Sequence, residues 1–174
     1  MTYNPNIPVG LCEILENKEA RVKRQRVWLD KYSLPLISFT INMPGRNKIS
    51  SMSNTIFEQG ISAITEICSS NSWPVLTRQI IHENTGQEAI FIVEPETVTQ
   101  LKQAMMRIEH THKLGRLMDL DVINIDGQIV SRNGLGIKKR QCLVCDEEAV
   151  ICIRSRAHTV DDLLTKVEEM ITHA

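Results

Sequence analysis

The spacing of apolar side chains divides the chain into alternating helical and extended segments. Apolar residues at helical intervals predict four helices. The first covers residues 11–32, and the second runs from Ser50 or Ser51 through Ile67. The third opens with Pro95 and Glu96 and runs through His112, and the last runs from Thr159 through Ile171. Shorter runs rich in apolar and β-branched residues predict strands over 34–41, 73–82, 88–94 and 118–125, with a further strand over 128–132.

The order of these segments predicts a fold. From Leu34 to Ile125 the chain runs strand, helix, strand, strand, helix, strand. This is the split βαβ order of ferredoxin-like folds, in which an antiparallel sheet carries two helices on one face. The 174 residues then form a single α+β domain, with an added N-terminal helix and a C-terminal hairpin and helix. The alternative is a nucleotidyltransferase-like sheet, suggested by the acid-apolar-acid-apolar order of residues 119–122.

Composition and charge exclude several classes of protein. A net charge of −1 argues against a general nucleic-acid binder, which is usually strongly basic. No apolar run approaches the roughly 18 residues of a membrane span, and residues 1–6 lack the features of a signal peptide. We therefore expect a cytoplasmic protein whose five cysteines are thiols or metal ligands, not a disulfide framework.

The first helix mixes apolar and basic residues. Its apolar positions recur near helical spacing and are Leu11, Ile14, Leu15, Val22, Leu29 and Tyr32. Its basic positions are Arg21, Lys23, Arg24, Arg26 and Lys31. Such a run of cations is typical of a solvated face, or of a docking surface for an acidic partner protein.

Two carboxylates lie in the strand that begins at residue 118. Alternation points its apolar side chains to one face and Asp119 and Asp121 to the other. Carboxylates two residues apart in a strand are roughly 6.5–7 Å apart at Cα and can converge on one Mg²⁺ ion. The alternative is a structural ion pair or an edge strand kept soluble by charge.

The Asp126-Gly127 pair predicts a tight hairpin after this strand. With a two-residue loop, Asp121 lies opposite Arg132. That arginine then stabilises the sheet as an ion-pair partner, or it binds a phosphate through its guanidinium fork.

Other residues have both a structural and a functional interpretation. Arg46 and Lys48 lie in a turn before a helix N-terminus, where an anion is favoured, although a plain surface loop has the same composition. His112 ends the helix that precedes the acid pair, where it caps the helix or acts as a general base.

The segment 138–158 forms a small cysteine-rich subregion. Cys142 and Cys145 form a Cys-x-x-Cys pair, and Cys152 and His158 follow. Together they would make a Cys₃His zinc site, with buried thiols as the alternative. A thioredoxin-type redox role is not favoured, because the expected βαβ context is absent.

Several stretches, in order and over nearly the whole chain, resemble the citrate lyase holo-acyl-carrier-protein synthase family, also called apo-citrate lyase phosphoribosyl-dephospho-CoA transferase. They are His112-x-Leu114-Gly115-Arg116-Leu117-x-Asp119-x-Asp121-Val122, Leu34-Pro35-Leu36-Ile37-Ser38-Phe39-Thr40 with Pro44-Gly45, Ser131-Arg132-x-x-Leu135-Gly136, and Cys142-Leu143-x-Cys145 through Arg154-Ser155-Arg156-x-His158.

The resemblance implies a nucleotidyl-type transferase. Its donor is 2'-(5''-triphosphoribosyl)-3'-dephospho-CoA, and its acceptor is a serine of the acyl-carrier subunit of citrate lyase. The serine oxygen displaces pyrophosphate and leaves the prosthetic group attached through a phosphodiester.

The resemblance also implies roles for individual residues. Asp119 and Asp121 would hold Mg²⁺, partly by analogy with nucleotidyltransferases, and either His112 or one of these acids would accept the serine proton. Arg116 would act in catalysis. The residues that would bind the substrate are Arg132, Arg46, Lys48, Gly115, Arg154 and Arg156. Two other classes stay open: a zinc-stabilised module that binds the acyl-carrier subunit, and an assembly factor without catalysis.

Overall fold

The structure is a computed structural model that describes residues 7–131 and 140–174. No helix within these ranges is both long enough and apolar enough to cross a bilayer. In chain order, the elements are α1 (Leu11–Tyr32), β1 (Leu36–Ile41), α2 (Ser51–Ser70), β2 (Val75–Glu83), β3 (Gly86–Val93), α3 (Val98–Thr111), the short 3₁₀ helix η1 (Gly115–Leu117), β4 (Met118–Ile123), α4 (Ala149–Ser155) and α5 (Val160–Thr172).

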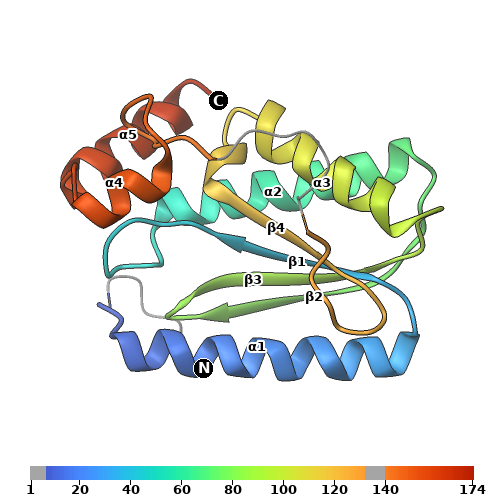
Figure 1. The fold of residues 1–174 in the computed structure, drawn as a ribbon. Coiled ribbons are helices and arrows are strands. Elements are labelled where there is room, and N and C mark those ends of the chain that lie inside the picture. Colours follow the sequence, from blue (N-terminus) through green and yellow to red (C-terminus); the bar gives the residue numbers. More distant parts are fainter. Residues whose placement is uncertain (1–6, 132–139) are drawn as a thin grey trace.

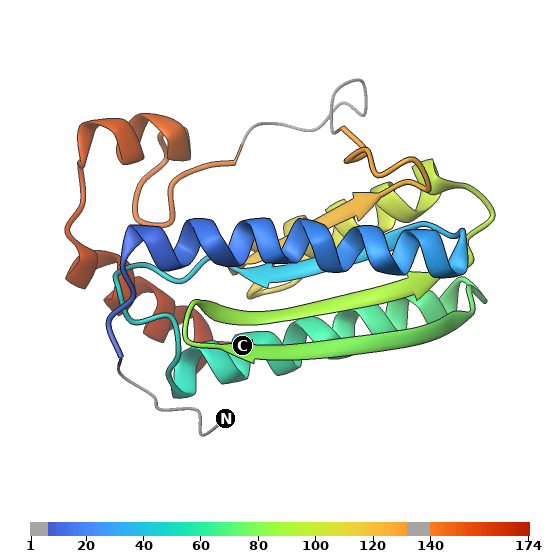
Figure 2. The ribbon, with the colours of Figure 1, turned by 90° about the horizontal axis from the view of Figure 1, so that it is seen from below.

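The sheet has the ferredoxin-like topology. Its strand order is β2-β3-β1-β4, and each neighbouring pair is antiparallel. Helices α2 and α3 cover one face of the sheet, and α1 crosses the other (Figure 1; Figure 2). The predicted α+β fold is confirmed, with helix α1 completing a third layer.

Side-chain caps determine where the helices begin. The Ser50 hydroxyl accepts the backbone N–H of Ser53, and the Thr159 hydroxyl accepts that of Asp162, as the sequence predicts. Helix α3 begins at Val98, whereas the sequence predicts that Pro95 and Glu96 open it. Its cap is Thr97, whose hydroxyl accepts the N–H of Gln100.

The main core lies between the sheet and helices α2 and α3. Every second side chain of β1 and β4 points into it, which leaves their other side chains for the α1 face. Phe39 of β1 stacks on Phe57 of α2 at 5.1 Å between ring centroids. Gly60 allows this approach, because a Cβ atom there would lie 2.2 Å from the Phe39 ring.

Helix α1 buries a polar side, contrary to the apolar stripe that its sequence predicts. Leu11 and Val22 are 72% and 64% exposed, whereas Gln25 and Leu29 are buried. The Gln25 side-chain amide donates to the Ser38 hydroxyl of β1 at 2.9 Å. Only the C-terminal half of α1 packs on apolar residues, because the sheet beneath its N-terminal half is polar.

That polar region is centred on Glu88 of β3, whose side chain is 2% exposed. Arg21, Arg24 and Asn17 of α1 donate to its carboxylate at 2.6–2.7 Å. Burial by itself would raise the pKa of Glu88, but these hydrogen bonds and the Arg21 charge lower it below its usual value. The sequence places Arg21 and Arg24 on a solvated or docking face, but in the structure both pair with this buried carboxylate.

We expect Glu88→Gln to lower the free energy of unfolding by roughly 2–4 kcal/mol at pH 7, because it leaves two arginines without their buried counter-charge. The folded-state pKa of Glu88 is depressed, so its stabilisation is present above the unfolded pKa of about 4.3 and is lost as the pH falls through the folded pKa. Urea unfolding from pH 7 to pH 3 measures both effects.

Asp30→Asn is the matched control, because the Arg26–Asp30 pair is exposed on the same helix and should contribute less than about 1 kcal/mol. Equal losses for the two variants would contradict the buried charge cluster.

The hairpin after β4 has one more loop residue than predicted. The Asn124 N–H donates to the Gln128 carbonyl, and Ile123 pairs with Ile129. The loop is therefore 125–127, with Gly127 at φ +81°. In this register, the position opposite Asp121 is the one before Arg132, whereas the sequence predicts Arg132 itself. Arg132 lies outside the described residues. In the described part of the predicted fifth strand, residues 128–131, Ile129 forms an isolated bridge with Ile123.

Candidate active site at the edge of the sheet

Segments that are far apart in sequence meet at the end of the sheet where β1 finishes and β4 begins. The Asn42 N–H donates to the Leu117 carbonyl, which joins the chain after β1 to η1. The Val9 N–H donates to the Arg46 carbonyl, which brings the start of α1 to the same loop. Helices α4 and α5 also lie at this end (Figure 1).

Asp119 and Asp121 share the α1 face of β4, as alternation predicts. Their side chains are 36% and 39% exposed. Asp119 Oδ1 lies 2.9 Å from an Arg140 guanidinium nitrogen, and Asp121 Oδ1 lies 3.7 Å from Lys102 Nζ. Both acids are thus half-open to solvent and each faces a cation, as in the ion-pair interpretation of the sequence.

The outer edge of β4 is held by side chains of α3. Lys102 Nζ donates to the Leu120 carbonyl at 3.2 Å, and Glu109 Oε1 accepts the Leu120 N–H at 3.0 Å. Both side chains are buried. They occupy edge positions that a continuing fifth strand would use. Beside them, the Val130 N–H donates to the Val122 carbonyl at 2.8 Å.

Arg140 is the main site residue that the sequence analysis missed. Its guanidinium donates to Glu109 Oε1 at 2.7 Å, to Asp119 Oδ1 at 2.9 Å and to the Met118 carbonyl at 3.3 Å. The sequence offers a weak signal for Lys102 and Glu109, because seven residues separate them and place both on one face of a helix. No local pattern pairs Arg140 with Asp119.

Two predicted site residues build the local structure. The Arg116 guanidinium donates to the carbonyls of Gln141 and Cys142 and so holds the cysteine-rich segment against η1. Gly115 packs on the end of α3: a Cβ atom there would lie 2.3 Å from the Ile108 carbonyl oxygen.

His112 follows the last turn of α3, a helix that covers the face of the sheet opposite α1 and the two acids. Its Nδ1 accepts the Leu114 N–H at 3.1 Å, so in the neutral imidazole Nε2 carries the proton. Burial lowers the pKa of this imidazole below its ordinary value. This shift favours the neutral imidazole at pH 7.

The other predicted cations lie in two places. Lys48 Nζ donates to the Met43 carbonyl at 2.6 Å and Arg46 Nε donates to the Val9 carbonyl at 3.4 Å, so both stabilise the turn that carries them. Burial lowers the pKa of Lys48. Arg154 and Arg156 are exposed in and just after α4.

The four predicted zinc ligands come together. One ligand atom from each of Cys142, Cys145, Cys152 and His158 lies within 4.8 Å of all the others. Burial would raise the pKa of the Cys142 thiol, but hydrogen bonds from the backbone of Val144 and Cys145 and from neighbouring thiols lower it to about 7. A thiolate is the form that binds a metal. These residues form a Cys₃His cluster that suits a metal ion.

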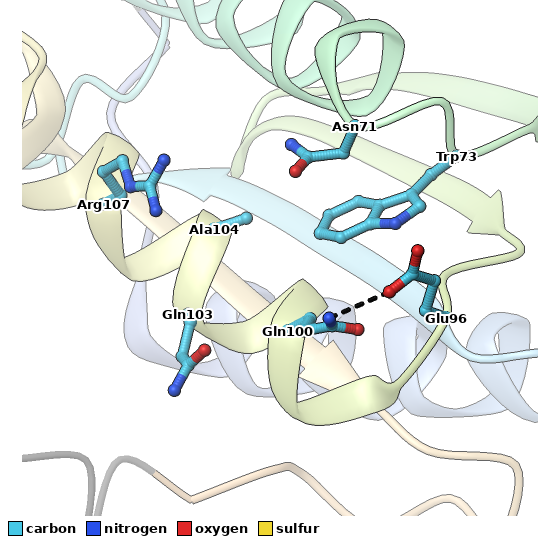
Figure 3. Close-up of a pocket in the computed structure, with 7 residues that line it drawn as sticks. All are labelled: Asn71, Trp73, Glu96, Gln100, Gln103, Ala104 and Arg107. Atoms are coloured by element: carbon cyan, nitrogen blue, oxygen red, sulfur yellow. Dashed lines mark hydrogen bonds between the residues drawn. The ribbon is translucent and has the colours of Figure 1, made fainter.

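A cavity of about 130 Å³ lies elsewhere, between the end of α2 and helix α3 (Figure 3). Trp73 and Arg107 are among its lining residues. It is on the face opposite the acids, and it is smaller than the roughly 300–1,000 Å³ typical of ligand sites. We therefore place the candidate site at the edge of β4.

The fold defines an α+β protein of the ferredoxin-like type. It has a charged site on its edge strand and a Cys₃His cluster that could bind a metal ion. The family model described as apo-citrate lyase phosphoribosyl-dephospho-CoA transferase matches residues 9–174. The chain belongs to this family, as the resemblance in the sequence predicts.

Curated relatives match most of this chain. A protein of Vibrio cholerae serotype O1, named as a probable apo-citrate lyase phosphoribosyl-dephospho-CoA transferase, is 48% identical over 99% of this chain and 97% of its own. Proteins of Shigella boydii serotype 18 and Escherichia coli strain SE11 with the name apo-citrate lyase phosphoribosyl-dephospho-CoA transferase are each 33% identical, over 94% of this chain and 88% of their own.

Gly115→Ala should lower the free energy of unfolding by about 1–3 kcal/mol, because the new methyl group has no space beside the backbone of α3. Gly10→Ala is the control, since a Cβ atom there meets only the Glu13 side chain at 3.4 Å. Thermal unfolding compares the two variants. An unchanged Tm with an increased KM for the donor would instead favour the predicted substrate-binding role of Gly115.

Proposed function

We propose that this protein transfers the phosphoribosyl-dephospho-CoA group from 2'-(5''-triphosphoribosyl)-3'-dephospho-CoA to a serine of the acyl-carrier subunit of citrate lyase. The serine oxygen forms a bond to the α-phosphorus, the bond from that phosphorus to the leaving oxygen breaks, and pyrophosphate departs. The observation that carries the proposal is the pair Asp119 and Asp121, half-open on an edge strand among cations, within a family match over residues 9–174.

Asp119 and Asp121 fit a divalent cation in donor chemistry. They supply hard carboxylate oxygens from one strand face, and their exposure leaves room for the waters and phosphates that usually complete a Mg²⁺ shell. In this proposal they hold Mg²⁺, which when bound would neutralise charge on the phosphates. Arg140, which is about one-third exposed, would stay at Asp119 and also face the donor's phosphates, while Lys102 would remain buried at the edge of β4.

The cations of the chain would bind the rest of a polyanionic donor. Arg140 is the best placed, because it already touches Asp119 and is about one-third exposed. Arg154 and Arg156 are exposed at the same end of the molecule. Arg46, Lys48 and Arg116 are engaged with backbone carbonyls, so in this proposal they shape the site's walls.

The acceptor serine must lose its proton to a base, which in this proposal is His112 or one of the acids. Burial lowers the pKa of His112 and so favours its neutral form at pH 7, and to act as a base its Nδ1 would have to release the Leu114 N–H and take the proton there. His112 follows the helix that covers the other face of the sheet, so it would act only on a serine that reaches around the edge of β4. The predicted docking surface for an acidic carrier keeps three exposed cations of α1, which are Lys23, Arg26 and Lys31.

Asp119→Asn and Asp121→Asn should each lower kcat/KM by roughly 100-fold or more, because each removes a ligand charge from the proposed Mg²⁺ site. The assay mixes the protein, the apo carrier, the donor and Mg²⁺ and weighs the carrier by intact mass spectrometry. Asp126→Asn, in the exposed hairpin loop, is the control. An unchanged rate in both acid variants would overturn the assignment of the site, and no added mass with the intact donor would overturn the reaction.

If His112 is the base, kcat/KM should fall as the pH drops through the lowered pKa of its imidazole, below 6.5. The neutral imidazole accepts the proton, so the loss comes on the acid side. His112→Gln should remove this limb of the pH profile and lower the rate above it. A variant that keeps the wild-type profile would assign the proton to another group.

The second candidate is a non-catalytic, zinc-stabilised module that binds the acyl-carrier subunit. The Cys₃His cluster favours it, together with the exposed apolar side chains of α4, among which Ile153 is 75% exposed. The mass assay separates the two candidates, because such a module would form a complex with the carrier and leave its mass unchanged.

A further inference from the structure

The Cys₃His cluster has the geometry of a closed metal site. Cys145 Sγ lies 3.5 Å from Cys152 Sγ and 3.2 Å from His158 Nε2. Tetrahedral zinc, with bonds of about 2.3 Å to sulfur and about 2.0 Å to nitrogen, separates its ligands by roughly 3.5–3.8 Å. Four protein ligands leave no open position, which is typical of structural zinc and not of catalytic zinc.

The local structure aims all four side chains inward. The bridge between Gln141 and Glu148 closes a turn that carries Cys142 and Cys145. The Val144 N–H donates to Cys142 Sγ at 3.5 Å, and α4 carries Cys152 on its only buried position. The left-handed residue Arg156, at φ 51°, ends α4 and turns the chain back so that His158 faces Cys145.

The segment needs such a support, because its own core is small. Within residues 140–158, the buried positions are Cys142 and Cys152, which are themselves members of the cluster. A seven-residue helix such as α4 is not stable without tertiary contacts. A metal ion supplies in small segments the stability that apolar burial supplies elsewhere.

The cluster is tied directly to the edge of β4. Cys142 is two residues after Arg140, whose guanidinium lies on Asp119 and Glu109. Between them, Arg116 fixes the carbonyls of Gln141 and Cys142 to η1. Whatever holds Cys142 therefore also fixes where Arg140 lies.

We propose that Cys142, Cys145, Cys152 and His158 bind one zinc ion, and that this ion holds Arg140 at the carboxylates of β4. The argument for the metal site uses only the geometry of the cluster. That a fixed Arg140 assists group transfer rests on the proposed function.

Elemental analysis of the full-length protein tests the metal. Protein reconstituted with zinc and then desalted should retain one zinc per chain. Cys152→Ser and Cys145→Ser should lose at least four-fifths of it, and Cys12→Ser should keep it, because Cys12 is exposed on α1 and is not one of the four clustered residues. Less than about one-fifth of a zinc in the wild type, or full zinc in the cluster variants, would overturn the site.

Cobalt substitution gives a readout that does not depend on a variant's folding. The wild-type chain loaded with Co²⁺ should show the intense visible d–d bands of a tetrahedral site and the near-ultraviolet charge-transfer bands of thiolate ligands. Zinc should displace them. A weak octahedral spectrum would overturn the proposed ligand set.

Hydrogen exchange of the zinc-loaded and chelator-treated wild type tests the link to Arg140. Zinc removal should raise exchange in residues 140–158 and at the Leu120 N–H, whose acceptor Glu109 is held by Arg140. The β1–β3 pairing should be unaffected. Unchanged exchange at Leu120 would overturn the link and leave the metal site intact. Zinc-loaded protein without transfer activity would overturn only the proposed function.

Discussion

The outer edge of β4 is the constraint on which the candidate site depends. A strand at the edge of a sheet exposes N–H and C=O groups that must find partners. Here Lys102 and Glu109 of α3 supply them to Leu120. These partners are charged and buried, so they require counter-charges of their own. Asp121 and Arg140 provide these, and the edge becomes a charged network instead of another strand.

This network joins the ferredoxin-like sheet to the C-terminal part of the chain. Arg140 contacts side chains of the edge, and Arg116 holds the backbone around Cys142. Farther along the chain, α5 packs Val167 into the main core. The segment between these attachments buries few side chains of its own, which gives a physical reason for a cluster of metal-binding type there.

Helix α1 shows a related compromise on the other face of the sheet. Its C-terminal half packs on apolar side chains, and its N-terminal half delivers Arg21 and Arg24 to the buried Glu88. Across the sheet, Glu88 lies beside Thr40, and Thr40 lies beside Asp119. The polar row therefore extends from the cluster under α1 to the candidate site and keeps that end of the sheet hydrophilic.

Short-range pattern in the sequence determined the order of the elements, the caps at Ser50 and Thr159, the shared face of Asp119 and Asp121, and the set of four metal-type ligands. The first three of these depend on residues close together in the chain, and the ligand set depends on a motif spread over residues 142–158. Tertiary structure alone decided the buried side of α1, the hairpin register and helix α4. It also brought Arg140 to Asp119 and Glu109, because ionic contacts between side chains 21 and 31 residues apart leave no periodic trace in the sequence.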